Sequence, residues 1–173
     1  RLLSSFILIP IAIFFIIQGS VFFTFFLSIL FLATSYEWLK MIKKNNLLKI
    51  LGIIFLFFSF YVAFIIREAY SFKSFLFIVI ICVSTDIGGY MFGKIFKGPK
   101  LTKISPKKTY AGVIGSFLLS LIAGLIFINY FAKDQIFLNT KGLLVMWIIF
   151  FISLVSQLGD LVISFFKRKA KLK

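Results

Sequence analysis

The chain has no histidine and a single cysteine, Cys82. These absences exclude zinc sites built from imidazole and thiolate ligands, and they exclude Ser–His and Cys–His catalytic triads. A single cysteine also rules out an intramolecular disulfide. A metal in this protein would therefore be a hard ion with oxygen ligands, such as Mg²⁺.

Acidic residues are also scarce, because the 173 residues include only 5 Asp or Glu against 20 Lys or Arg. Hydrophobic residues make up 61% of the chain, and the mean hydropathy is +1.09. A soluble globular domain contains roughly half apolar residues or fewer. The composition therefore predicts an all-α fold, a polytopic transmembrane helical bundle.

Six apolar segments each have about the ~20 residues that a helix needs to cross the ~30 Å hydrocarbon core of a bilayer. They cover residues 2–18, 20–36, 47–66, 72–93, 110–132 and 142–165. Only Gln18-Gly19-Ser20 joins the first two segments, which predicts a tight helical hairpin. We treat residues 1–173 as a single membrane domain, with N-terminal helices in 1–70 and catalytic-type helices in 71–173.

The placement of the basic residues predicts the orientation of these helices. Sixteen of the 20 lie at the N-terminus or after even-numbered helices, and four lie on the other side. Lys and Arg accumulate on the cytoplasmic side of membrane proteins, so we expect both chain ends in the cytoplasm. A net charge of +15 placed in this way indicates topology and contact with anionic lipid, with no nucleic acid as partner.

Two of the five acids, Asp86 and Asp160, stand inside apolar segments. A carboxylate near the bilayer core is costly, so it normally faces a protein interior or a wet cavity. Asp86 lies eight residues before Lys94, and Asp160 lies seven before Lys167, which puts both roughly 10–12 Å below the cytoplasmic rim. At this matched depth the two acids could converge on one cavity that opens to the cytoplasm.

The sixth segment carries a polar stripe at i, i+3, i+4, i+7 and i+11 spacing, which places its members on one helix face. The stripe consists of Ser153, Ser156, Gln157, Asp160 and Ser164. Such a face points to the interior of a bundle. Interhelical hydrogen bonding is the structural alternative to a site, above all for Ser153 and Ser164.

Small residues near the first acid also fit two interpretations. Gly88, Gly89 and Gly93 allow close approach of another helix, so packing is an alternative to a role in a site. Ser84 and Thr85 could bond back to their own helix or line the cavity. Both interpretations stay open at this point.

The basic loop 94–109, between the fourth and fifth segments, contains six lysines among turn residues. Lysine and hydroxyl side chains suit a polyphosphate. Ser105-Pro106 before an apolar segment also predicts a helix start, whose free N–H groups favour anions. A plain cytoplasmic basic loop is the alternative. Beside the two acids, however, this loop indicates carboxylate–Mg²⁺–phosphate chemistry at the lipid headgroup.

Three ordered blocks of residues resemble the phosphatidate cytidylyltransferase (CDP-diacylglycerol synthase) family. They are Ser84-Thr85-Asp86-Ile87-Gly88-Gly89-Tyr90 with Gly93-Lys94, then Ile104-Ser105-Pro106-Lys107-Lys108-Thr109, then Gln157-Leu158-Gly159-Asp160-Leu161 with Ser164 and Lys167-Arg168. The resemblance covers residues 84–168. It implies that CTP and phosphatidate, with Mg²⁺ as cofactor, give CDP-diacylglycerol and pyrophosphate. It also implies a multi-pass protein of the bacterial inner (cell) membrane with its active site facing the cytoplasm, and it is compatible with a homodimer.

The resemblance also implies roles for individual residues. Asp160 would be the metal-binding carboxylate. The catalytic residues would be Asp160, Asp86, Lys167 and Arg168. The substrate-binding residues would be Ser105, Lys107, Lys108, Thr109, Gln157 and Ser164.

The chain also departs from the pattern of that family. The family usually has an acid where Ile163 stands, and often one where Ala111 stands. Its signature continues past Lys-Arg into a Lys-Asp pair, a Pro-Gly-His-Gly-Gly turn and Asp-Arg-x-Asp. We therefore expect this chain to be truncated at its C-terminus and inactive by itself.

Two other classes of function stay open. One is a small ion- or proton-coupled transporter that uses Asp86 and Asp160, and the other is a non-catalytic membrane subunit. The lysine-rich loop favours the enzyme, because a cation path needs no cradle for phosphate.

Overall fold

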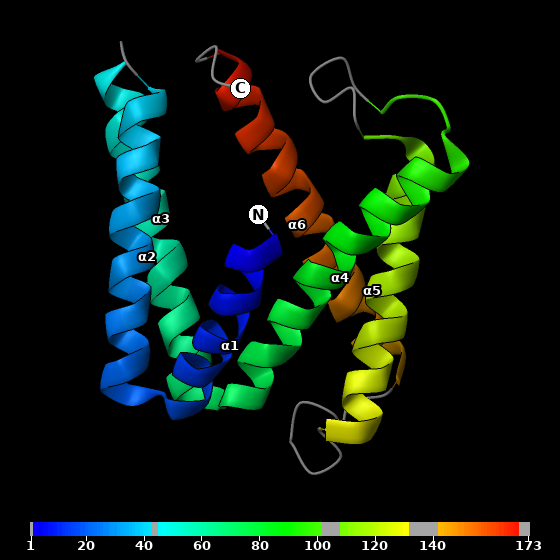
Figure 1. The fold of residues 1–173 in the computed structure, drawn as a ribbon, viewed down its shortest axis with the longest axis horizontal. Helices are drawn as coiled ribbons and strands as arrows, with labels where there is room; N and C mark the ends of the chain where they lie inside the picture. The colour runs from blue at the N-terminus through cyan, green and yellow to red at the C-terminus, as the bar shows by residue number, and fades with distance from the viewer. Residues whose placement is uncertain (1, 43–44, 102–107, 132–141, 170–173) are drawn as a thin grey trace. The chain divides into compact units, whose positions relative to one another are not determined.

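A computed structural model describes residues 2–42, 45–101, 108–131 and 142–169 of the chain. The elements are α1 (Leu2–Gln18), α2 (Ser20–Met41), α3 (Asn46–Ile65), a π-helical turn η1 (Ile66–Tyr70), α4 (Phe72–Phe96), α5 (Tyr110–Phe131) and α6 (Gly142–Lys169) (Figure 1). Several helices continue beyond the predicted apolar segments, because hydropathy marks the part that suits lipid and not the end of the helix. The all-α prediction is confirmed.

Five helices of the described residues are long and apolar enough to cross a membrane. They are α2, α3 continued by η1, α4, α5 and α6. The remaining helix, α1, has 17 residues and a length of about 25 Å, at the lower limit for a span. The chain is an integral membrane protein with multiple spanning helices.

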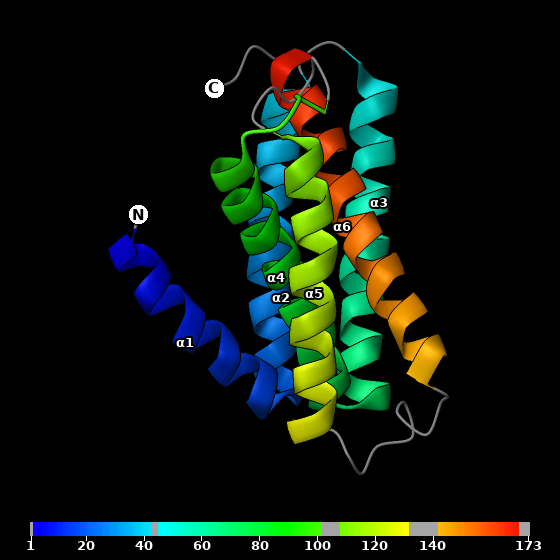
Figure 2. The same cartoon turned by 90° about the vertical axis from the view of Figure 1, so that its right-hand side faces the viewer.

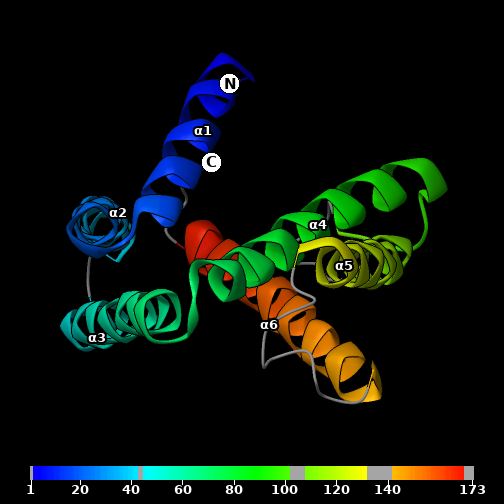
Figure 3. The ribbon, with the colours of Figure 1, turned by 90° about the horizontal axis from the view of Figure 1, so that it is seen from below.

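The chain divides into two compact units, Arg1–Leu76 and Phe77–Lys173, and the division falls within α4. The first unit contains the hairpin that we predicted at Gln18-Gly19-Ser20. There α1 ends, Gly19 takes a positive φ of 65°, and α2 begins. In Figure 3 α2 and α3 are seen end on and lie side by side, and the Trp38 ring of α2 covers Gly52 of α3.

A charged pair from η1 holds the α1–α2 turn. The Arg67 guanidinium donates to the carbonyl oxygens of Ile16 and Ile17 at 3.0 and 2.9 Å. Glu68 Oε1 accepts from the backbone N–H of Ser20 at 2.9 Å and lies 3.2 Å from Arg67 Nη1. One side chain thus satisfies the carboxyl end of α1 and the other the amino end of α2, where backbone groups have no partner within the helix.

The second unit is built on a seam of small residues between α4 and α5, which lie side by side (Figures 2 and 3). A Cβ atom at Gly88 would lie 2.5 Å from the carbonyl oxygen of Gly115. A Cβ at Gly112 of α5 would in turn lie 2.8 Å from the carbonyl oxygen of Gly89 and 3.5 Å from the Cα of Gly93. The packing interpretation of these α4 glycines is therefore confirmed.

Helix α6 packs against α5 and also contacts α4. The rings of Phe117 and Phe150 stack with their centroids 4.6 Å apart, and Ile149 fills the space beside Gly124. The start of α5 is held by short backbone pairing, because Leu101 N–H donates to Lys108 O at 2.8 Å and Tyr110 N–H donates to Pro99 O at 3.1 Å. This pairing fixes Lys108 next to the helices.

Candidate active site

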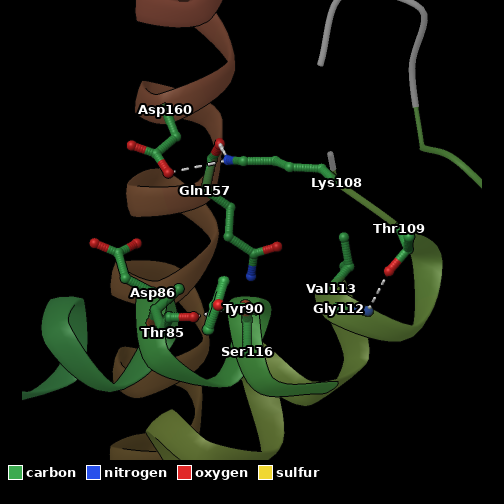
Figure 4. A pocket seen from close by; sticks show the side chains of 11 residues that line it. Thr85, Asp86, Tyr90, Lys108, Thr109, Gly112, Val113, Ser116, Gln157 and Asp160 are labelled. Atoms are coloured by element: carbon green, nitrogen blue, oxygen red, sulfur yellow. Dashed lines mark hydrogen bonds and ion pairs between the residues drawn. The ribbon is translucent and has the colours of Figure 1, made fainter. Parts of the chain in front are cut away.

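A cavity of about 230 Å³ lined in part by polar and charged side chains lies among α4, α5, α6 and the two residues before α5 (Figure 4). Its lining consists of Thr85, Asp86, Gly89, Tyr90, Lys108, Thr109, Gly112, Val113, Ser116, Gln157 and Asp160. All of these residues belong to the second unit. The cavity therefore does not depend on the N-terminal helices.

The two acids of the apolar segments line this one cavity. Asp86 comes from α4 and Asp160 from α6, where it stands one turn beyond Gln157. Matched depth in the membrane could not show whether the two carboxylates face each other. The packing of α4 and α6 shows that both line the same cavity. The side chain of Asp160 remains 55% exposed, so water and a polar ligand can reach it.

Lys108 reaches across the cavity from the residues before α5 (Figure 4). Its ammonium lies 3.1 Å from Asp160 Oδ2 and 3.3 Å from the backbone oxygen of Gln157. Carboxylates on two helices and an ammonium on the connecting loop thus meet in one space. Such a set can hold a cation and a phosphate together.

The base of the cavity carries buried hydroxyl groups. Thr85 Oγ1 lies 3.0 Å from Ser153 Oγ, and Ser116 Oγ donates to the backbone oxygen of Thr85 at 2.7 Å. Thr85 also bonds back to Ile81 O, at 2.8 Å. The interhelical interpretation of Ser153 is therefore confirmed, and Thr85 both bonds back and lines the cavity.

Comparison with known proteins identifies the family to which this chain belongs. The chain matches the profile of the Cytidylyltransferase family over residues 43–173, which includes every residue that lines the cavity. The chain belongs to the cytidylyltransferase family. Membership disfavours the transporter interpretation.

Three similar proteins illustrate the extent of the match. The phosphatidate cytidylyltransferase of Rickettsia bellii is 30% identical over the whole of this chain, which covers 76% of that protein. Those of Rickettsia typhi and Brucella suis are 42% and 34% identical over 52% and 59% of this chain. In these two cases the matched region spans only 40% and 36% of the relative's own length. No solved structure matches the chain.

The structure of this cytidylyltransferase-family chain brings some of the predicted site residues together and leaves others apart. The cavity lining includes Asp86, Asp160, Lys108, Thr109 and Gln157. On α6, three predicted residues are not part of that lining: Ser164, Lys167 and Arg168. Two more, Ser105 and Lys107, lie outside the described residues.

The helix start expected at Ser105-Pro106 lies outside the described residues, and the described helix α5 begins at Tyr110. Thr109 is the residue before the helix, and its hydroxyl accepts from the N–H of Gly112 at 3.1 Å. A threonine at this position satisfies a backbone donor that the helix leaves free. Thr109 therefore has a structural task in addition to its place in the cavity lining.

Several lining residues escaped prediction: Tyr90, Gly112, Val113 and Ser116. A signal for part of this set exists on α5, where small residues recur every three or four positions. They are Gly112, Gly115, Ser116, Ser120 and Gly124. Such a stripe indicates the face that another helix approaches, and in this chain the same face carries one wall of the cavity.

The donor set of the cavity fits a hard cation. Asp86 and Asp160 offer carboxylate oxygens, and the Gln157 side chain offers an amide oxygen. Within the part of the chain that the structure describes, no group of three or more His, Cys, Asp or Glu converges. Mg²⁺ is usually bound by one or two carboxylates together with water and substrate phosphates. The two aspartates are therefore enough carboxylate ligands for this ion.

Proposed function

We propose that the protein transfers the CMP moiety of CTP to phosphatidate, giving CDP-diacylglycerol and pyrophosphate. The observation that carries this proposal is the meeting of Asp86, Asp160 and Lys108 in one cavity within membrane-spanning helices. A lipid substrate needs a site within the membrane-spanning helices, and a charged nucleotide needs charged side chains in that site. Family membership and the names of the similar proteins support the same reaction.

The reaction needs positioning and charge stabilisation more than covalent chemistry from the protein. An oxygen of the phosphatidate phosphate attacks the α-phosphorus of CTP. The bond between the α-phosphorus and the bridging oxygen to the β-phosphorus breaks, and pyrophosphate leaves with that oxygen. Lys108, at the rim of the cavity, is placed to neutralise negative charge on the phosphates.

Mg²⁺ is the cofactor that we propose, with Asp160 and Asp86 as the carboxylates that would hold it. The ion would supply neutralisation of the phosphate charge. Asp160 already pairs with a cation, the ammonium of Lys108. In this scheme Asp160 would exchange that ammonium for the metal ion.

For the location of the protein we propose the bacterial inner (cell) membrane, with the cavity open to the cytoplasm. The support is the distribution of Lys and Arg, which favours a cytoplasmic position for loop 94–109 and the end of α6. CTP would then reach the site from the compartment in which it is made. A homodimer stays a prediction.

The first test is Asp160→Asn in the protein expressed from its complete reading frame, assayed in membranes with labelled CTP and phosphatidate. We expect the rate of CDP-diacylglycerol formation to fall by on the order of 100- to 1,000-fold, because an amide cannot supply the negative charge. Glu37→Gln is the matched control, since Glu37 is an exposed acid on α2 and does not line the cavity.

Unchanged turnover in Asp160→Asn would remove Asp160 from the mechanism. The absence of labelled CDP-diacylglycerol from the unaltered protein, with CTP and Mg²⁺ both present, would contradict the proposed reaction itself.

A further inference from the structure

Three hydroxyl side chains join α4, α5 and α6 at the base of the cavity, and we refer to Thr85, Ser116 and Ser153 as the hydroxyl hub. They are 1%, 3% and 0% exposed, although each carries a polar group. Buried polar groups are costly in a membrane protein unless they are partnered. Their partners should therefore show what the hub does.

The contacts of the hub form a continuous path. Thr85 Oγ1 lies 2.8 Å from Ile81 O and 3.0 Å from Ser153 Oγ. Each hydroxyl carries one proton and two lone pairs, so the two hydroxyls together can satisfy both contacts. Gln157 Nε2 donates to Ser153 Oγ at 3.5 Å, which extends the path into the cavity.

A second contact fixes α5. Ser116 Oγ donates to the backbone oxygen of Thr85 at 2.7 Å, the shortest of these hydrogen bonds. The glycine seam brings one face of α4 against one face of α5. A directional hydrogen bond between the two helices strengthens the selection of that rotation.

The hub lies next to the carboxylates in the sequence. Asp86 directly follows Thr85, and Asp160 stands two helical turns beyond Ser153. A helix advances about 100° per residue, so rotation of α4 or α6 by one residue would move its carboxylate away from the cavity. The rotation that the hub selects is the one in which both acids line the same space.

We propose that the hydroxyl hub is a positioning device for the transfer reaction, in which Thr85, Ser116 and Ser153 hold α4 and α6 at the rotation that presents Asp86 and Asp160 to one cavity. The catalytic consequence rests on the proposed function, whereas the geometry rests on the hydrogen bonds alone. The two parts can therefore be tested separately.

The geometric test uses thiol cross-linking without substrate. In a Cys82→Ala background, Asp86→Cys and Asp160→Cys provide a pair of thiols, and linkers of graded length report how closely they approach. Adding Thr85→Val removes the hydroxyl and keeps the shape of the side chain. We expect the yield with the shortest reactive linker to fall several-fold.

Thr34→Val is the matched control for this substitution. The Thr34 hydroxyl bonds back to Leu30 O at 2.8 Å, the same local bond that Thr85 makes to Ile81 O. Thr34 lies on α2, in the other unit. We expect this change to leave the cross-linking yield as it is.

The kinetic test uses the protein with both aspartates in place. We expect Thr85→Val and Ser153→Ala to lower kcat by roughly 10- to 100-fold, the effect of moving a reacting group by about 1 Å. The KM for CTP should change little, and Thr85→Ser should restore most of the rate because it restores the hydroxyl. Ser59→Ala, which removes a hydroxyl bonded only back to Phe55 O on α3, should keep the parental rate.

An unchanged cross-linking yield in both Thr85→Val and Ser116→Ala would overturn the proposal, as would a parental kcat in Thr85→Val. Should Thr85→Val fail to accumulate in membranes, the cross-linking yield of Ser116→Ala decides, because this variant removes a single hydrogen bond from the hub. A protein that makes no CDP-diacylglycerol at all would contradict the proposed function, and the cross-linking result would still decide the geometry.

Discussion

Lys108 Nζ and Asp160 Oδ2 lie 3.1 Å apart and form an ion pair between the residues before α5 and the face of α6 that lines the cavity. The side chains are 28% and 55% exposed. Ion pairs with this degree of exposure contribute about 0–1 kcal/mol to stability. The pair is therefore better explained by the binding of charged ligands in the cavity than by stabilisation of the fold.

This relationship predicts the effect of Lys108→Met. The free energy of unfolding should change by no more than about 1 kcal/mol, because the pair is exposed. The apparent affinity for CTP should fall by about tenfold or more, since the loss of a charge-assisted hydrogen bond of about 1.5–3 kcal/mol weakens the hold on phosphate. The measurements are thermal unfolding in detergent and the KM for CTP.

Lys40→Met is the control for that variant, because Lys40 is exposed on α2 and does not line the cavity. A large loss of stability in Lys108→Met with a parental KM would show that the ion pair serves the fold and not the substrate.

The glycine seam predicts a second effect. A Cβ at Gly88 would meet the backbone oxygen of Gly115, which cannot move aside as a flexible side chain can. Gly88→Ala should therefore separate α4 from α5 and lower the free energy of unfolding by about 1–3 kcal/mol, with loss of activity. Chemical denaturation in detergent measures the change.

Gly142→Ala is the matched substitution, because none of the residues that the structure describes lies within 4 Å of the Cβ that it adds at the start of α6. It should leave stability and activity close to parental values. Equal stability of the two variants would argue against close packing along the seam.

The charged pair of η1 predicts a third effect, confined to stability. Arg67→Met would leave the carbonyl oxygens of Ile16 and Ile17 without their donor. Ile16 is buried whereas Ile17 is exposed, and an unsatisfied buried acceptor costs about 1–3 kcal/mol, so the melting temperature should fall by several degrees. Glu68→Gln should be milder, since the amide oxygen can still accept from the N–H of Ser20.

The rate per folded molecule is the deciding measurement for these two variants. It should stay close to parental, because Arg67 and Glu68 do not line the cavity that holds Asp86 and Asp160. A melting temperature unaffected by Arg67→Met would show that the turn does not depend on the guanidinium.

The sequence predicted the helices well because hydropathy and length are local properties. Helical periodicity also placed Gln157 and Asp160 on one face, and that face lines the cavity. What could not be predicted is which faces of α4, α5 and α6 meet. Ser116 illustrates this, because its role depends on the approach of the backbone at Thr85, 31 positions away in the chain.

Lys108 shows the same limit of sequence-based prediction within loop 94–109. Among six lysines of similar local sequence, composition could not single out Lys108, whose ammonium reaches Asp160 of α6. The backbone pairing of residues 99–101 with 108–110 makes that selection, because it fixes where the side chain begins.

The turn between α1 and α2 has an evolutionary consequence. Gly19 has a positive φ, and a Cβ added there would collide with the guanidinium of Arg67. A side chain at position 19 would thus strain the turn and displace the guanidinium from the carbonyl oxygens of Ile16 and Ile17. Among homologues that keep this hairpin, glycine at 19 and arginine at 67 should be inherited together and lost together.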